Sequence, residues 1–121
     1  VCPAVRIAVE TVDLCLGRIL KEVIKANGIL VVSADHGNAD DMYEHKKTGE
    51  VNLDPATGEP KSKTSHSLNP VPFYAYDPAG TAKIRLSAHS QLGISSLAAV
   101  CIKLLGFEPP SDYDPSVIEV G

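Results

Sequence analysis

Several features that would narrow the function are absent from this sequence of 121 residues. No apolar run approaches the roughly 20 residues that a helix needs to cross a bilayer, which argues against a membrane protein. The net charge of -4 argues against a nucleic-acid-binding surface. The three cysteines, Cys2, Cys15 and Cys101, form no C-x-x-C motif, so we expect reduced thiols in a cytoplasmic protein.

What is present is the composition of one folded domain. Hydrophobic residues make up 44% of the chain and charged residues 21%, which is typical of globular rather than disordered protein. The chain opens at Val1 without a methionine or a helix cap, and apolar periodicity begins almost at once. From this pattern we expect a fragment or a processed piece of a longer protein.

Apolar periodicity predicts a helix near each end of the chain. The first ends at Asn27-Gly28, whose residues tolerate the left-handed backbone conformation, and the second ends at Gly106. Three- and four-residue spacing defines the predicted inner stripes, which are Val5, Ala8, Val12, Cys15/Leu16, Ile19 and Val23 in the first helix, and Ile94, Leu97, Ala98, Cys101 and Leu104/Leu105 in the second.

The predicted strands indicate an α/β fold. Ile29–Ala34 is apolar without strict alternation, which is typical of a strand covered on both faces in a mostly parallel sheet. Phe73–Tyr76 and Ile84–Leu86 predict further short strands.

A long polar segment, 44–65, lies between the first two predicted strands. It carries turn signals at Thr48-Gly49 and Thr57-Gly58, which predict a short hairpin. Connections of this length are usually functional or mobile.

The first predicted strand ends in side chains that can bind a metal. Asp35 and His36 follow Ile29–Ala34 directly, and ligand sites in open α/β sheets lie beyond the carboxyl ends of strands. Together with His66 they form a carboxylate and imidazole set that favours Zn²⁺, Mn²⁺ or Fe over Ca²⁺.

Each of these residues also has a structural alternative. Asp35 is suited to capping the turn, and His36 to a hydrogen-bonded structural role. His66 has hydroxyl side chains on either side of it as ordinary partners. His45 and His89 lie in polar surroundings and are expected to be solvated.

Two longer motifs resemble a known family. SADHGNADDM and KTSHSLNPVPF are similar to the C-terminal part of cofactor-independent phosphoglycerate mutases, which belong to the alkaline-phosphatase-like metalloenzymes. AVETVDLCLGRIL resembles the family's helix before the metal-binding strand, and LGISSLAAVCIKLLGFEPPSDYDPSVI resembles its closing segment. The resemblance covers nearly the whole chain, and the pairing of DHGNA with T-x-H-x-x-N-P-V-P-F is its most specific part.

This resemblance implies a fold, a reaction and a set of ligands. Residues 1–121 would form the C-terminal portion of the metal-binding phosphatase-like domain, as part of a three-layer sandwich. The family interconverts 3-phosphoglycerate and 2-phosphoglycerate in glycolysis and gluconeogenesis through a phosphoserine intermediate, using two metal ions, usually Mn²⁺. By match to its motifs, Asp35 and His36 would bind the ion that activates the serine, and His66 would bind the second ion.

Parts of the family's machinery have no counterpart in this sequence. These are the serine nucleophile, a further metal-binding aspartate, an Asp-x-x-x-His ligand pair and the second, substrate-binding domain. We therefore expect no catalytic residue in this chain, no activity from it alone, weak or absent metal binding, and self-association. The rival interpretations are another alkaline-phosphatase-like phosphatase or sulfatase, which would share Asp35-His36 but not TSHSLNPVPF, and a non-catalytic interaction module.

Overall fold

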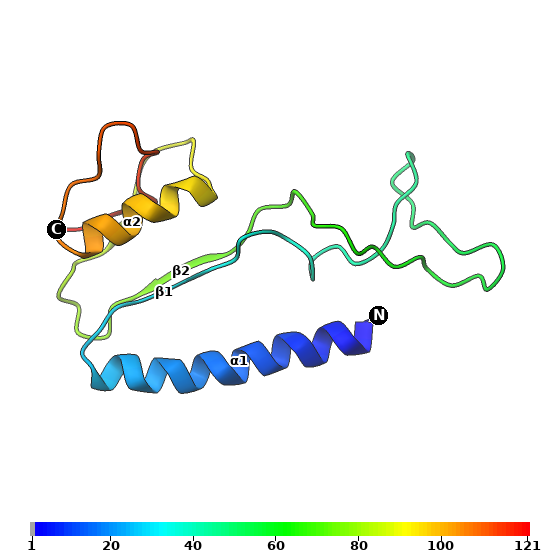
Figure 1. Ribbon diagram of the computed structural model, residues 1–121, viewed down its shortest axis with the longest axis horizontal. Coiled ribbons are helices and arrows are strands. Elements are labelled where there is room, and N and C mark those ends of the chain that lie inside the picture. The colour runs from blue at the N-terminus through cyan, green and yellow to red at the C-terminus, as the bar shows by residue number, and fades with distance from the viewer. Residues whose placement is uncertain (1) are drawn as a thin grey trace. The chain divides into compact units, whose positions relative to one another are not determined.

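The computed structural model describes residues 2–121 as two α-helices, four short strands and one 3-10 helix (Figure 1). In chain order these elements are α1 (Cys2–Lys25), β1 (Leu30–Ser33), β2 (Phe73–Tyr76), β3 (Arg85–Leu86), the 3-10 helix η1 (Ile94–Ser96), α2 (Leu97–Leu104) and β4 (Ile118–Glu119). The predicted α/β class is confirmed. Neither helix within 2–121 has the length and apolar character needed to span a bilayer.

Contacts within the chain divide it into two compact units. Unit 1 comprises the residues up to Glu22 together with Val32–Phe73, and unit 2 comprises Val23–Val31 together with Tyr74–Gly121. The candidate metal ligands lie in unit 1, and the fully buried hydrophobic residues lie in unit 2.

Helix α1 forms where the periodicity predicts it, and it ends as predicted. Asn27 adopts a φ of 54°, and the Gly28 N–H donates to the Val23 carbonyl at 2.9 Å. The predicted inner stripe is only partly correct, because Val12 is 66% exposed and Ile19 is 53% exposed. Apolar residues also occupy the other faces of α1, so spacing alone does not select one of them.

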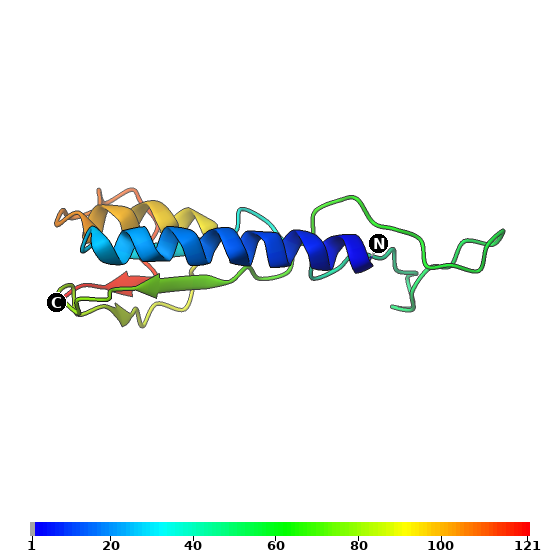
Figure 2. The same cartoon turned by 90° about the horizontal axis from the view of Figure 1, so that it is seen from below.

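Both described sheets have two strands. β1 pairs with β2, and Figure 1 shows the chain leaving β1 through the polar segment and returning along β2 in the opposite direction. β3 pairs antiparallel with β4, with Arg85 opposite Glu119 and Leu86 opposite Ile118 (Figure 2). The predicted mostly parallel sheet is therefore not confirmed by the described strands, and β4 was not predicted.

The polar segment is a ladder of isolated bridges with two tight turns. The bridges join Tyr43 to Ser62, His45 to Val51 and Leu53 to Pro60. Both predicted turns are present, since Gly49 and Gly58 adopt φ values of 87° and 72° that glycine accommodates without strain.

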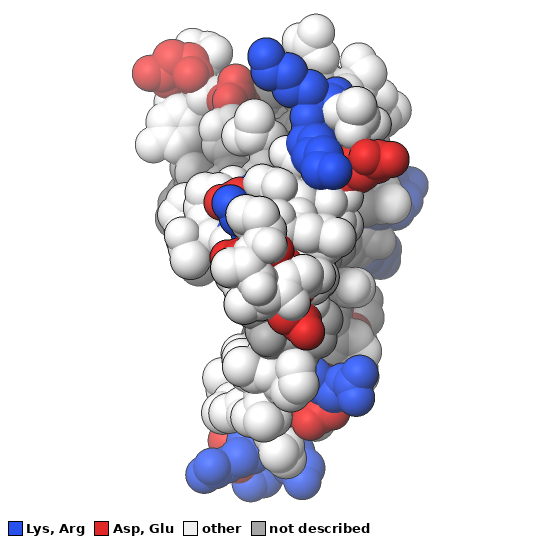
Figure 3. Space-filling view, turned by 90° about the vertical axis from the view of Figure 1, so that its right-hand side faces the viewer, with Lys and Arg blue, Asp and Glu red and all other residues white. Residues whose placement is uncertain are grey.

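On the face shown in Figure 3, basic and acidic side chains are interspersed, so that face offers no uniformly basic surface for nucleic acid.

The core of unit 2 comes from α2 and β4. Ala99, Val100 and Ile118 are fully buried. The buried Ser116 hydroxyl donates to the Ile118 carbonyl at 2.7 Å, which satisfies a polar group that would otherwise be costly to bury.

The predicted inner stripe of the second helix is largely wrong, since only Leu97 and Leu104 of its members are partly buried. Ala98 and Cys101 are exposed, Ile94 is 47% exposed and Leu105 is 73% exposed. The sequence LAAVCIKLL is apolar on nearly every helical face, so its periodicity does not select a buried face. In addition, the 3-10 turn Ile94–Ser96 has three residues per turn, which shifts the phase before α2 begins.

This core predicts a difference between two identical substitutions. Ile118→Ala should lower the free energy of unfolding by about 2–5 kcal/mol, because it leaves a cavity at a closed site. Ile94→Ala, at a half-exposed side chain, should lower it by about 1 kcal/mol or less. Urea unfolding followed by circular dichroism measures both, and equal losses would contradict the observed orientation of this region.

An ion pair in unit 2 predicts a dependence on pH. The Lys103 Nζ lies 2.6 Å from the Glu119 Oε2, and this hydrogen bond lowers the pKa of Glu119 below its ordinary value of 4.5. A carboxylate with a depressed folded-state pKa contributes stability above its unfolded-state pKa and loses that contribution as the pH falls through the folded-state value. Glu119→Gln should therefore be less stable than the parent chain at pH 7, and the difference should shrink below about pH 4.5. A difference independent of pH between 7 and 2.5, measured beside the exposed control Glu108→Gln, would be inconsistent with this role.

Candidate metal site

A backbone bridge brings two loops of unit 1 together beside the candidate ligands. One loop follows β1 and carries Asp35 and His36, and the other precedes β2 and carries His66. Gly37 and Ser67 form an antiparallel bridge in which the Ser67 N–H donates to the Gly37 carbonyl at 2.8 Å. The neighbouring imidazole rings of His36 and His66 stack as a result, with centroids 3.5 Å apart and planes inclined by 28°.

Gly37 is required at the bridge because the two loops approach so closely there. A Cβ atom on residue 37 would lie 2.1 Å from the Ser67 Oγ and 2.8 Å from an Asp40 oxygen. Ser67 is only 7% exposed, so its side chain has little room to move aside. The glycine of the DHG motif therefore permits the contact that places the histidines side by side.

The hydrogen bonding of His36 leaves the lone pair of its other nitrogen free. The Nδ1 atom lies 3.2 Å from the Gly37 carbonyl, and because a carbonyl only accepts, Nδ1 carries the proton in this contact. The Nε2 lone pair is then directed elsewhere, and it lies 3.6 Å from an oxygen of Asp35. A backbone carbonyl that fixes the tautomer in this way is the usual support of a metal-binding histidine.

The structural alternative for His36 is compatible with its hydrogen bond to the Gly37 carbonyl, whereas those for Asp35 and His66 find no support in the described residues. The Asp35 side chain is 88% exposed, and within 2–121 it accepts no hydrogen bond that would make it a turn cap. His66 is exposed and, in the same range, makes no hydrogen bond with its hydroxyl neighbours. The chemistry of the three side chains fits a divalent metal such as Mn²⁺ or Zn²⁺.

The three residues do not form one three-ligand site. Among residues 2–121, no group of three histidine, cysteine or acidic side chains is arranged to hold a single ion. The expectation that His66 serves a different ion from Asp35 and His36 does not need such a group. The assignment of all three residues as ligands stays a prediction.

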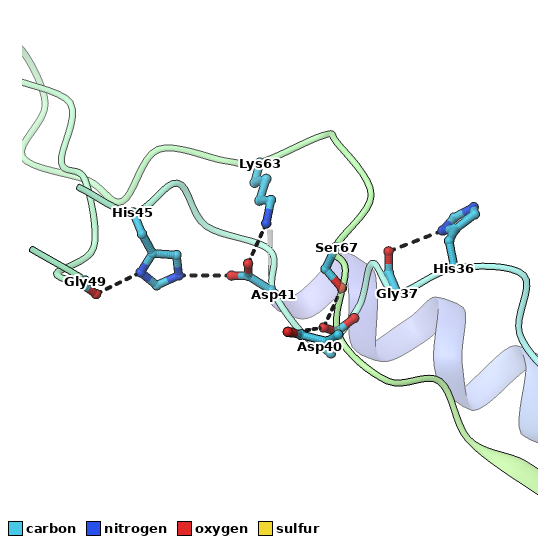
Figure 4. A network of polar contacts seen from close by, with 9 residues as sticks. His36, Gly37, Asp40, Asp41, His45, Gly49, Lys63 and Ser67 are labelled. Atoms are coloured by element: carbon cyan, nitrogen blue, oxygen red, sulfur yellow. Dashed lines mark hydrogen bonds and ion pairs between the residues drawn. The ribbon is translucent and has the colours of Figure 1, made fainter. Parts of the chain in front are cut away.

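Asp40 links the two loops a second time (Figure 4). Its Oδ2 atom accepts hydrogen bonds from the Ser67 Oγ at 2.8 Å and from the Asn69 Nδ2 at 2.5 Å. The bonds from Asn69 and Ser67 favour the ionised carboxylate and hold the pKa of Asp40 below its ordinary range.

Asp41 makes its contacts with the polar segment instead. It accepts from the Lys63 Nζ at 2.5 Å and faces the His45 Nε2 at 3.0 Å, and these hydrogen bonds, that of Lys63 first, lower the pKa of Asp41 (Figure 4). His45 is exposed, as expected, but it is also held by hydrogen bonding that was not predicted, because its Nδ1 lies 3.1 Å from the Gly49 carbonyl. Sequence reasoning missed both aspartates, and the available signal was the acidic pair directly after DHGNA.

Comparisons with known proteins agree with a metal-binding role. Residues 4–109 match the family model described as the metalloenzyme superfamily. A probable 2,3-bisphosphoglycerate-independent phosphoglycerate mutase of Leptospira interrogans is 43% identical over 113 residues, which is 93% of this chain and 20% of the relative. The 2,3-bisphosphoglycerate-independent phosphoglycerate mutase of Trypanosoma brucei brucei is 39% identical over 114 residues, with the same coverage.

A solved structure is also similar. The crystal structure of Leishmania mexicana phosphoglycerate mutase at low cobalt concentration matches with a TM-score of 0.81 and 38% identity, over 93% of this chain and 21% of that one. The chain therefore spans about a fifth of the length of the relatives that it matches.

The close approach at Gly37 makes a testable difference between two glycines. Gly37→Ala should destabilise unit 1 by about 1–3 kcal/mol, because the new methyl group displaces Ser67 from Asp40. Gly17→Ala, in α1 with no atom within 4 Å of the new Cβ, should stabilise the chain by roughly 1 kcal/mol. Urea unfolding measures both. A neutral Gly37→Ala would show that the two loops are not in contact.

Proposed function

The chain belongs to the metalloenzyme superfamily, and from this premise we propose that it is the metal-binding C-terminal part of a cofactor-independent phosphoglycerate mutase. The observation that carries the proposal is the contact between Gly37 and Ser67, which places His36 and His66 together at the end of β1. The likeness to phosphoglycerate mutases along 93% of the chain supports the same assignment.

In this proposal the three predicted residues hold two ions. Asp35 and His36 bind one ion through the carboxylate and the Nε2 lone pair, and His66 contributes to the other. Mn²⁺ is the ion that we expect, and when bound it would neutralise phosphoryl charge and favour the ionised form of an attacking hydroxyl. The Gly37 carbonyl holds the His36 ring in the tautomer that binding requires.

The remaining parts of the reaction lie outside this chain in our proposal. Ser67 donates to Asp40 and Ser33 donates to the Pro72 carbonyl at 3.1 Å, so these hydroxyls serve structural contacts. With no serine in the nucleophile's motif, the chain alone does not isomerise phosphoglycerate. It acts in the cytoplasm as part of a larger three-layer domain whose sheet is mostly parallel.

Manganese binding tests the assignment. Because a metal site needs its complete set of ligands, calorimetry should give only weak Mn²⁺ binding to this chain. His66→Ala should weaken it further, whereas His89→Ala, the same change at an exposed histidine of unit 2, should leave it unchanged.

Adding 3-phosphoglycerate with Mn²⁺ should yield no 2-phosphoglycerate above background. Tight stoichiometric binding, equal effects of the two substitutions, or turnover by the chain would each refute a part of this proposal.

Self-association is a further consequence. Apolar side chains on α1 are exposed, among them Ile7 at 64%, Val12 at 66% and Leu14 at 70%. Val12 also borders an apolar hollow lined by Cys15, Leu16 and Val32. Contiguous apolar surface of more than a few hundred Å² promotes association.

Light scattering at micromolar concentration should therefore show a dimer or a larger species. Val12→Asp should shift the distribution towards monomer, and Val51→Asp, on the polar segment, should not. A sharp monomer peak with cooperative unfolding in the parent chain would show that the chain is self-sufficient.

A further inference from the structure

We propose that Asp40 is a positioning residue that holds the loop of His66 against the loop of His36. The backbone bridge between Gly37 and Ser67 supplies one hydrogen bond between these loops. Asp40 supplies two more, since a single carboxylate oxygen accepts from both the Ser67 hydroxyl and the Asn69 amide.

Both donors to Asp40 lie close to His66 in the sequence. Ser67 and Asn69 are the next residue and the third residue after His66, so their side chains anchor the backbone on which its imidazole is carried. Ser67 is 7% exposed, so its hydroxyl would lose its hydrogen bond without regaining full contact with water if Asp40 were removed. The hydrogen bonds from Asn69 and Ser67 lower the pKa of Asp40, as expected for donors that favour its ionised form.

The adjacent Asp41 provides a matched comparison. Both are aspartates one position apart, but among the described residues Asp41 contacts Lys63 and His45 and makes no hydrogen bond with Ser67 or Asn69. Removing either carboxylate changes the charge by the same amount. The loss of Asp40 frees Ser67 and Asn69, which flank His66 on its C-terminal side, whereas the loss of Asp41 frees Lys63 and His45.

The four histidines of the chain allow one spectrum to report both contacts. In proton NMR of the metal-free chain, the stacked rings of His36 and His66 should show mutual ring-current shifts and a direct ring-to-ring contact. Asp40→Ala should abolish both features and leave His45 and His89 unmoved. Asp41→Ala should move the His45 signal and preserve the stack. Ser67→Ala, which removes one of the two donors, should weaken the stack in the same direction as Asp40→Ala.

Titration with Mn²⁺ then tests the consequence for metal binding, and this arm rests on the proposed function. Paramagnetic broadening of His36 and His66 should need about 10- to 100-fold more Mn²⁺ in Asp40→Ala than in Asp41→Ala. A stack that survives Asp40→Ala, or that is lost equally in Asp41→Ala, overturns the role of Asp40. A parent chain with an intact stack that is not broadened by Mn²⁺ overturns the proposed metal ligands, while the metal-free spectra still decide the role of Asp40.

Discussion

The backbone hydrogen bond from Ser67 to Gly37 is the contact on which the candidate site depends. The Ser67 nitrogen lies 2.8 Å from the Gly37 oxygen, and the bond joins the chain before the polar segment to the chain after it. Its closeness excludes any side chain at residue 37, and it places one histidine on each side of the bridge. The β1–β2 pairing and the Asp40 hydrogen bonds also join these segments, but this bridge is the contact that lies directly beside both histidines.

Asp40 and Asp41 add further contacts between the end of β1 and the chain that returns to β2. Asp40 reaches the loop of His66, and Asp41 reaches Lys63 and His45 in the polar segment. Two adjacent carboxylates thus connect the end of β1 both to the loop of His66 and to the polar segment. The polar segment has few apolar residues to bury, so these hydrogen bonds, rather than a core, fix its position relative to the strand end.

Sequence reasoning succeeded where one physical signal dominated. The α1 helix and its end at Asn27-Gly28, β1, β2 and the turns at Gly49 and Gly58 followed from periodicity and from residues suited to positive φ. It failed for the buried face of α2, because LAAVCIKLL has no polar face to orient the helix. It could not supply the pairing of Gly37 with Ser67 or the contacts of Asp40, since bonds between residues distant in sequence leave no periodic pattern.

Anomalous diffraction at the manganese absorption edge tests the central claim most directly. Crystals of the chain grown in a large excess of Mn²⁺ should show a peak, of partial occupancy, within bonding distance of an Asp35 oxygen and of the Nε2 atom of His36. The rings of His36 and His66 should remain neighbours in the same map. Peaks confined to other residues, such as Asp41 and His45, would contradict the account, because they would show that the strand end of β1 is not where this chain binds metal.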